Sequence, residues 1–245
     1  MMYLESLLLP SSGSRYFMTK YTDWKNWESN KFGKFNAEQN IYYKKIISNV
    51  SATKEILEIG YGNGSFLGWC KQKKINVYGV ETDTDLLKRA KKNGFTVFQS
   101  IKKIKSKQFD LIVLLDVLEH IPQNKILNFM KQLNNLLKIN GHIIIRVPNG
   151  SSPFGLTNQH GDITHVSIIN AAKLDYWSKL LQLKIVYCGA DLTPIYNGHL
   201  LKTPSRFLKK VLYIILEKIV RYIFSPQSKG VLSANLLCLL KKDLA

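Results

Sequence analysis

Three glycines at alternate positions are the feature that most constrains how this chain can fold. The run Glu55–Gly60 has the composition of a short β-strand, and Gly62 and Gly64 follow it. A helical pattern opens directly afterwards, at Ser65. Glycine lets the chain turn sharply and lets the backbone approach a ligand. The segment therefore predicts a strand–turn–helix unit with a ligand at the carboxyl end of the strand.

Strand-like and helix-like patterns alternate along the rest of the chain, which indicates βαβ crossovers and a parallel sheet. Asn93-Gly94 is expected to end the helix Thr84–Lys92, and Asn140-Gly141 the helix Asn124–Lys138. Asn170 is expected to cap the helix Asn170–Leu181. A loop rich in Gly, Ser and Asn spans residues 149–169. The expected strands are Glu55–Gly60, Asn76–Glu81, Phe95–Gln99, Phe109–Leu115, His142–Pro148, Leu183–Cys188 and Asn235–Leu240. The expected helices between and around them are Ser65–Lys73, Thr84–Lys92, Asn124–Lys138 and Asn170–Leu181.

The spacing of the glycine loop distinguishes between cofactors. Dinucleotide sites carry Gly-x-Gly-x-x-Gly, whereas this loop reads Gly-x-Gly-x-Gly with Glu58 two residues before its first glycine. Glu81 ends the second expected strand, 21 residues after Gly60. A carboxylate in that place can accept hydrogen bonds from both hydroxyls of a ribose. The alternative is a tight turn that holds no ligand.

Glu58–Gly64, Glu81 and the stretch Phe109–Pro122, with its Leu-Glu-His-Ile sequence, resemble class I S-adenosylmethionine-dependent methyltransferases. The likeness is to the branch of small-molecule and surface-polysaccharide biosynthesis. It implies an α/β fold, doubly wound and Rossmann-like. In that fold the seven-stranded sheet is mainly parallel, helices cover both faces and the last strand is antiparallel.

The resemblance implies S-adenosyl-L-methionine as cofactor and assigns candidate residues to it. The glycine loop would lie beside the methionyl end, the acid after the second strand would bind the ribose, and residues after the third strand would flank adenine. No acid stands at Gln99–Ile101, where the family often has one. Asp116 would face the methionyl amine or the acceptor; alternatively it caps the following turn. The candidate residues are Glu58, Gly60, Tyr61, Gly62, Gly64, Glu81, Thr82, Ser100 and Asp116.

Residues 146–174 resemble the Val-Pro-Asn … Asp-x-x-His pattern of methyltransferases in surface-polysaccharide clusters, with His165 at the histidine position. A hydroxyl acceptor must lose a proton, and a neutral histidine suits that step near pH 7. We therefore expect His165 to be catalytic, Asp162 to orient it and His120 to lie at the same rim. Two alternatives stay open: His165 only bridges the loop, or His160, Asp162 and His165 bind a divalent metal.

The net charge of +18 arises from 35 basic residues, of which only five are arginine. It suggests an anionic partner, or else a drift of composition toward lysine.

The chain has neither the Asn/Asp-Pro-Pro-Tyr of amine methyltransferases nor a Pro-Cys nucleophile, which argues against nucleic-acid acceptors. Cys70, Cys188 and Cys238 form no Cys-x-x-Cys pair, so a reducing, cytoplasmic setting is expected. The chain contains no run of about 18 uncharged apolar residues, so no membrane-spanning helix is expected.

We expect residues 1–50 to form an N-terminal arm and a helix, and residues 51–245 the methyltransferase domain. The arm, which contains Trp24 and Trp27, either forms a lid over the acceptor or simply packs against the domain. A basic amphipathic helix at about 205–224 could dock on the core, on a second subunit or on the inner face of an anionic membrane. The leading hypothesis is O-methylation of a sugar or lipid-linked surface glycan. A quinone-like or lipid acceptor, and a non-catalytic cofactor-binding protein, are the alternatives.

Overall fold

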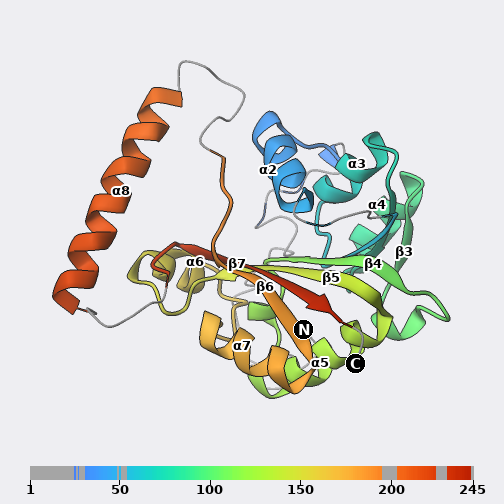
Figure 1. Ribbon diagram of the computed structural model, residues 1–245. Coiled ribbons are helices and arrows are strands. Elements are labelled where there is room, and N and C mark those ends of the chain that lie inside the picture. The colour runs from blue at the N-terminus through green and yellow to red at the C-terminus, as the bar shows by residue number, and fades with distance from the viewer. Residues whose placement is uncertain are drawn as a thin grey trace, which may run out of the picture.

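The computed structural model describes residues 25, 27, 31–48, 50, 54–194, 203–224 and 231–243. One mixed sheet organises these residues (Figure 1). Its strands are β1 (Glu55–Ile59), β2 (Asn76–Val80), β3 (Thr96–Phe98), β4 (Phe109–Leu115), β5 (Leu137–Pro148), β6 (Leu183–Ala190) and β7 (Asn235–Lys242). They are ordered β3-β2-β1-β4-β5-β7-β6, and only β7 runs antiparallel to its neighbours. The expected doubly wound, mainly parallel sheet with an antiparallel last strand is confirmed.

Helices cover both faces of the sheet (Figure 1). The helices in the described part of the chain are α2 (Ala37–Ile47), α3 (Ser65–Gln72), α4 (Thr84–Lys92), α5 (Gln123–Leu136), α6 (Leu156–His160), α7 (Ala171–Leu180) and α8 (Thr203–Phe224), the last of which covers neither face. Side-chain caps begin several of them: Asn36 forms a capping box with Gln39, Asp83 caps α4 and Asn170 caps α7. Short 3₁₀ turns occur at Ile101–Lys103, Leu118–His120 and Pro153–Gly155.

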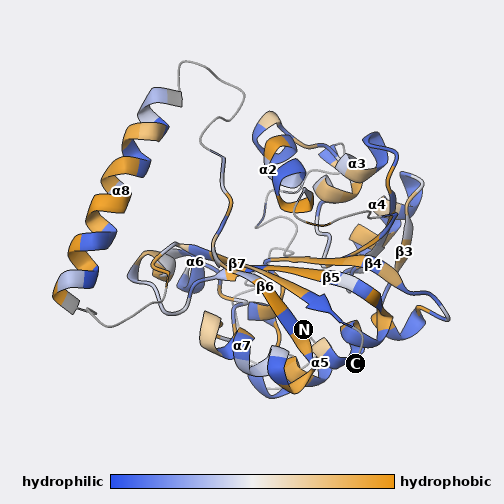
Figure 2. Cartoon of the chain, in the orientation of Figure 1, coloured by the Kyte–Doolittle hydropathy of each residue, from blue (hydrophilic) through white to orange (hydrophobic). Residues whose placement is uncertain are grey.

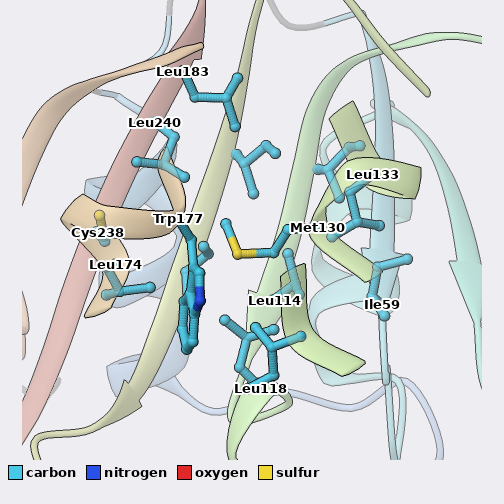
Figure 3. Close-up of a cluster of buried hydrophobic side chains, with 14 of the residues drawn as sticks. Ile59, Leu114, Leu118, Met130, Leu133, Leu174, Trp177, Leu183, Cys238 and Leu240 are labelled. Carbon is cyan, nitrogen blue, oxygen red and sulfur yellow. The ribbon is translucent and has the colours of Figure 1, made fainter. Parts of the chain in front are cut away.

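Alternation along β4 divides the core into two layers. Ile112 and Leu114 point toward α5 and α7, where Met130 and Trp177 belong to the same buried cluster (Figure 3). Val113 points the other way, into the cluster formed with α2 and α3. A strand buried on both faces explains why Phe109–Leu115 is a nearly continuous apolar run.

The structure corrects one expected helix end. Asn140-Gly141 does not terminate α5, because that helix already ends at Leu136. Leu137 is extended, pairs with Phe109 of β4 and has a fully buried side chain. Burial of Leu137 against β4 therefore ends the helix earlier than the local turn signal suggests. Asn140, with φ of 62°, forms an irregularity inside β5 instead.

Two regions differ from the compact α/β body. The loop after β5 contains a 3₁₀ turn and α6, although its composition indicated no regular structure. Helix α8 stands at the side of the body in Figure 1. None of the described helices is both long enough and apolar enough to cross a membrane.

Candidate cofactor and acceptor site

The glycine loop after β1 has a backbone that favours glycine at three positions. Gly60, Gly62 and Gly64 have φ values of 66°, 52° and 70°, in the left-handed region. A Cβ atom on Gly62 would lie 2.7 Å from the ring of Trp27, and one on Gly64 would lie 2.6 Å from the ring of Phe32. The loop is thus held between α3 and aromatic side chains of the N-terminal arm.

Glu81, at the end of β2, is joined to this loop by its carboxylate. One oxygen accepts a hydrogen bond from the Gly62 amide at 3.2 Å. The other accepts from the Thr82 amide at 2.7 Å and from the Asp83 amide at 3.2 Å. The two elements that the sequence assigned to one cofactor therefore meet at the carboxyl ends of β1 and β2.

Glu58 lies beneath the loop with an exposed fraction of 4%. Burial, and then the negative charge of Glu81, raise the pKa of Glu58 well above its usual value. Its Oε2 has no hydrogen-bond partner among the residues that the structure describes. An acceptor atom left in this state suits a ligand that brings its own donor, as the amine of S-adenosylmethionine would.

The other predicted cofactor residues take different positions. The ring of Tyr61 is buried against Gly79 and Phe32, so its side chain belongs to the core under the loop. Ser100 directly precedes the turn Ile101–Lys103 at the end of β3. These placements keep Tyr61 and Ser100 at the edge of the sheet where the sequence expected the cofactor, and their roles stay predictions.

Asp116 follows β4 and pairs with an arginine that the sequence analysis did not assign. Its carboxylate accepts hydrogen bonds from Nε of Arg146, at 3.0 Å, and from Nη2 of the same side chain. The turn Leu118–His120 has Val117 at its N-cap and no side-chain cap. The alternative that Asp116 serves as a helix cap therefore does not hold.

Two histidines and two carboxylates meet beyond β4 and β5. The rings of His120 and His165 have centroids 4.7 Å apart. Nε2 of His165 lies 3.9 Å from Oε1 of Glu119 and 3.8 Å from Oδ2 of Asp162. Nδ1 of His165 is 2.9 Å from the carbonyl oxygen of Gln159. Because a carbonyl only accepts, Nδ1 carries the hydrogen, and the lone pair of the neutral ring is on Nε2.

The two carboxylates of this cluster differ in protonation. Glu119 is fully buried, and neither of its oxygens has a hydrogen-bond partner among the described residues. Burial, and then the charge of Asp116, raise the pKa of Glu119 to about 8. Burial would also raise the pKa of Asp162, but an ion pair with Lys25 and hydrogen bonds from Thr164 outweigh it and hold the pKa at about 2. Burial, and then His165, lower the pKa of His120.

The same cluster has the composition of a metal site. One ligand atom each from Glu119, His120 and His165 lies within 4.8 Å of the others, so the trio could hold a divalent cation. Among the described residues, the set considered from the sequence, His160, Asp162 and His165, does not form such a close group of ligand atoms.

The N-terminal arm contacts both the glycine loop and the cluster around Asp162 and His165. Lys25 forms a 2.8 Å ion pair with Asp162, and the carbonyl of Trp27 accepts a 2.8 Å hydrogen bond from Arg89 of α4. Trp27 covers Gly62, so it lies on the glycine loop. Trp24, the other tryptophan of the expected lid, lies outside the described residues.

Four of these residues had no assigned role from the sequence: Lys25, Glu119, Arg146 and Gln159. Glu119 stands within the Leu-Glu-His-Ile sequence and Arg146 directly precedes Val-Pro-Asn, so both had a local signal. Lys25 and Gln159 had none, since they act through an ion pair and a backbone carbonyl.

Residues 35–187, more than half of the chain, match the family described as "Methyltransferase domain". The chain belongs to this family. The expected class, a methyltransferase that uses S-adenosylmethionine, is thereby confirmed. Among curated protein sequences, none matches this methyltransferase.

Solved structures share the fold at low sequence identity. A SAM-dependent methyltransferase from Archaeoglobus fulgidus is 22% identical, with a TM-score of 0.61; the match covers 87% of this chain and 97% of that one. The plantazolicin methyltransferase BpumL, solved in complex with SAH, is 17% identical with a TM-score of 0.55, over 91% and 88% of the chains. An S-adenosylmethionine-dependent methyltransferase from Clostridium acetobutylicum is 13% identical with a TM-score of 0.53, over 91% and 95%.

Proposed function

We propose that this methyltransferase transfers the methyl group of S-adenosylmethionine to a hydroxyl of a sugar or of a lipid-linked surface glycan. The observation that carries the proposal is His165, whose Nδ1 is bound to the Gln159 carbonyl while Nε2 faces a buried cluster. An imidazole fixed with its hydrogen on Nδ1 can accept a hydroxyl proton at Nε2. The Val-Pro-Asn … Asp-x-x-His resemblance supports a glycan acceptor.

The protein's part in the reaction is to hold the cofactor, align the acceptor with it and remove the proton of the acceptor hydroxyl. The cofactor supplies a methyl group on a positively charged sulfur. The glycine loop and Glu81 hold the cofactor, and alignment of the acceptor oxygen with the methyl carbon accounts for much of the rate. When the acceptor oxygen takes up that methyl group, Nε2 of His165 would accept the hydroxyl proton, and the neutral sulfide form of the cofactor would leave. Asp162 stays ionised 3.8 Å away and stabilises the imidazolium, and His120 lies against the same ring.

The proposal is tested with methyl-labelled S-adenosylmethionine and a fractionated envelope extract. Label should appear in a carbohydrate or lipid-linked glycan fraction. His165→Ala should lower the rate by about 10²- to 10⁴-fold, while His160→Ala, on the exposed histidine of the same loop, should leave it unchanged. Both variants should bind S-adenosylhomocysteine as the wild type does, as isothermal titration calorimetry can measure.

Each contrary outcome replaces a part of the proposal. Label in a quinone or simple lipid fraction would replace the glycan by another small-molecule acceptor. Cofactor binding with no label in any fraction would favour a non-catalytic partner protein. Activity lost on dialysis against a chelator, and restored by Mg²⁺, would make Glu119, His120 and His165 cation ligands and remove His165 from the role of base.

A further inference from the structure

Helix α8 presents its apolar side to solvent and its polar side to the rest of the protein. Leu208, Leu212, Ile215, Ile219 and Tyr222 follow each other at intervals of three and four residues, so they form one stripe. Their exposed fractions are 58%, 55%, 49%, 49% and 84%. Figure 2 shows α8 as a mainly hydrophobic helix at the edge of the molecule. This orientation is the reverse of that of a helix that docks on its own core.

The opposite side of α8 carries the contacts to the body. Arg206 forms an ion pair with Glu38 of α2. Tyr213 makes an edge-to-face ring contact with Phe154, at 5.4 Å between centroids. Arg206, Tyr213 and Glu217 are half-buried, whereas the apolar stripe is exposed. Docking on the core, one of the alternatives from the sequence, therefore does not account for the stripe.

Charge decides what kind of surface fits this stripe. Lys209 and Lys218 are exposed on its two sides, where long side chains can reach past an apolar layer to phosphate groups. The basic residues of α8 are Arg206, Lys209, Lys210, Lys218 and Arg221, against the single acid Glu217. With a net charge of +18, two copies of the chain repel one another. An anionic surface is attracted instead.

We propose that α8 lies in the interface of an anionic phospholipid bilayer, with the stripe Leu208–Tyr222 among the acyl chains and Lys209 and Lys218 at the phosphates. Phe154, which contacts Tyr213, belongs to the loop that also carries Asp162 and His165. Helix α8 is therefore in contact with the loop that also carries these two residues. The relevance of this placement to a lipid-linked glycan acceptor rests on the proposed function. The binding of α8 to lipid does not depend on that function.

The test is co-sedimentation of the full chain with vesicles of phosphatidylcholine, with and without one third phosphatidylglycerol. The wild type should bind the anionic vesicles, and the bound fraction should fall as salt rises. The double variant Leu212→Asp, Ile219→Asp should bind at least about tenfold more weakly, because two apolar contacts are lost. Ile139→Asp is the matched control: Ile139 is 55% exposed, lies in β5 and should not affect binding.

Three outcomes would overturn the proposal. One is the absence of binding to anionic vesicles by the wild type. Another is equal binding with and without phosphatidylglycerol, which would remove the role of charge. The third is a wild-type dimer, seen by light scattering, that the double variant dissociates; this would assign the stripe to a second copy of the chain. None of these measurements uses methyl transfer, so failure here and failure of the proposed function are separable.

Discussion

The proposed cofactor half and the proposed acceptor half of the site lie at the same edge of the sheet, but they are assembled over different distances along the chain. The cofactor half consists of Gly60–Gly64 and Glu81, on two neighbouring parallel strands. The acceptor half joins Glu119 and His120 to Asp162 and His165, and adds Lys25 from the N-terminal arm. Local backbone conformation builds the first half, and tertiary contacts build the second.

The difference has a chemical consequence. In the cofactor half, the Glu81 carboxylate is satisfied by backbone amides that are fixed by the fold. In the acceptor half, the Glu119 carboxylate is buried without a partner among the described residues, and Asp162 depends on a lysine from the arm. We expect the first half to respond to changes of backbone and the second to changes of charge.

The largest effect should come from the backbone of the cofactor half. Gly62→Ala places a Cβ atom at φ of 52° and 2.7 Å from Trp27, so the loop must shift. S-adenosylhomocysteine should bind about 10- to 100-fold more weakly, as measured by calorimetry. Gly94→Ala is the control, because Gly94 has φ of 75° but its Cβ would meet only the end of Lys71, at 3.5 Å. Equal losses of affinity in the two variants would contradict a specific role for the loop.

A change of charge in the acceptor half should alter the pH dependence of stability. The pKa of Glu119 is about 8 in the folded protein, above its usual 4.5, so the folded state holds this proton more tightly than the unfolded state. The stabilisation is full below pH 4.5, is lost progressively as pH rises from 4.5 to about 8, and is absent above that pH. Glu119→Gln should remove this loss, which is on the order of a few kcal/mol at about 1.4 kcal/mol per pKa unit.

Urea unfolding of wild type and Glu119→Gln at pH 5, 7 and 9 measures that change. The variant should gain stability relative to the wild type from pH 5 to pH 7, and gain further by pH 9, with the gain levelling off above the pKa of about 8. Glu217→Gln, on a half-buried carboxylate of α8, is the control and should show no such trend. A constant difference between wild type and Glu119→Gln at all three pH values would show that Glu119 is ionised throughout.

The smallest effect should come from the link between the arm and the acceptor half. Lys25→Ala removes the 2.8 Å ion pair with Asp162, in which the lysine is 32% exposed. A partly exposed pair contributes up to about 1 kcal/mol. We expect KM for the acceptor to rise about two- to fivefold, with cofactor affinity unchanged, in steady-state assays. Lys34→Ala, on an exposed lysine nearby, should change neither value; a loss of cofactor affinity in Lys25→Ala would instead place the arm's main role at Gly62.

Most elements of the fold were predictable because their signals are local. The apolar run Phe109–Leu115 and the cap Asn170 depend on neighbours along the chain, and the structure has both in place. The prediction that Asn140-Gly141 ends α5 was wrong, because burial of Leu137 against β4 outweighed the local turn signal. Helix α8 was expected from its periodicity, but periodicity alone does not say whether an apolar face meets a core or solvent.

The sequence by itself determined the parallel sheet, the glycine loop, Glu81 as its partner and the class of cofactor. The first three follow from short-range spacing, because each is a strand, a turn or a residue at the end of the next strand, whereas the cofactor was implied by the family resemblance of these motifs. The tertiary structure alone decided that Arg146 pairs with Asp116, that Gln159 sets the tautomer of His165, that Glu119 is buried, and that α8 turns its apolar stripe outward. These features depend on which distant segments exclude water from one another, and spacing along the chain does not carry that information.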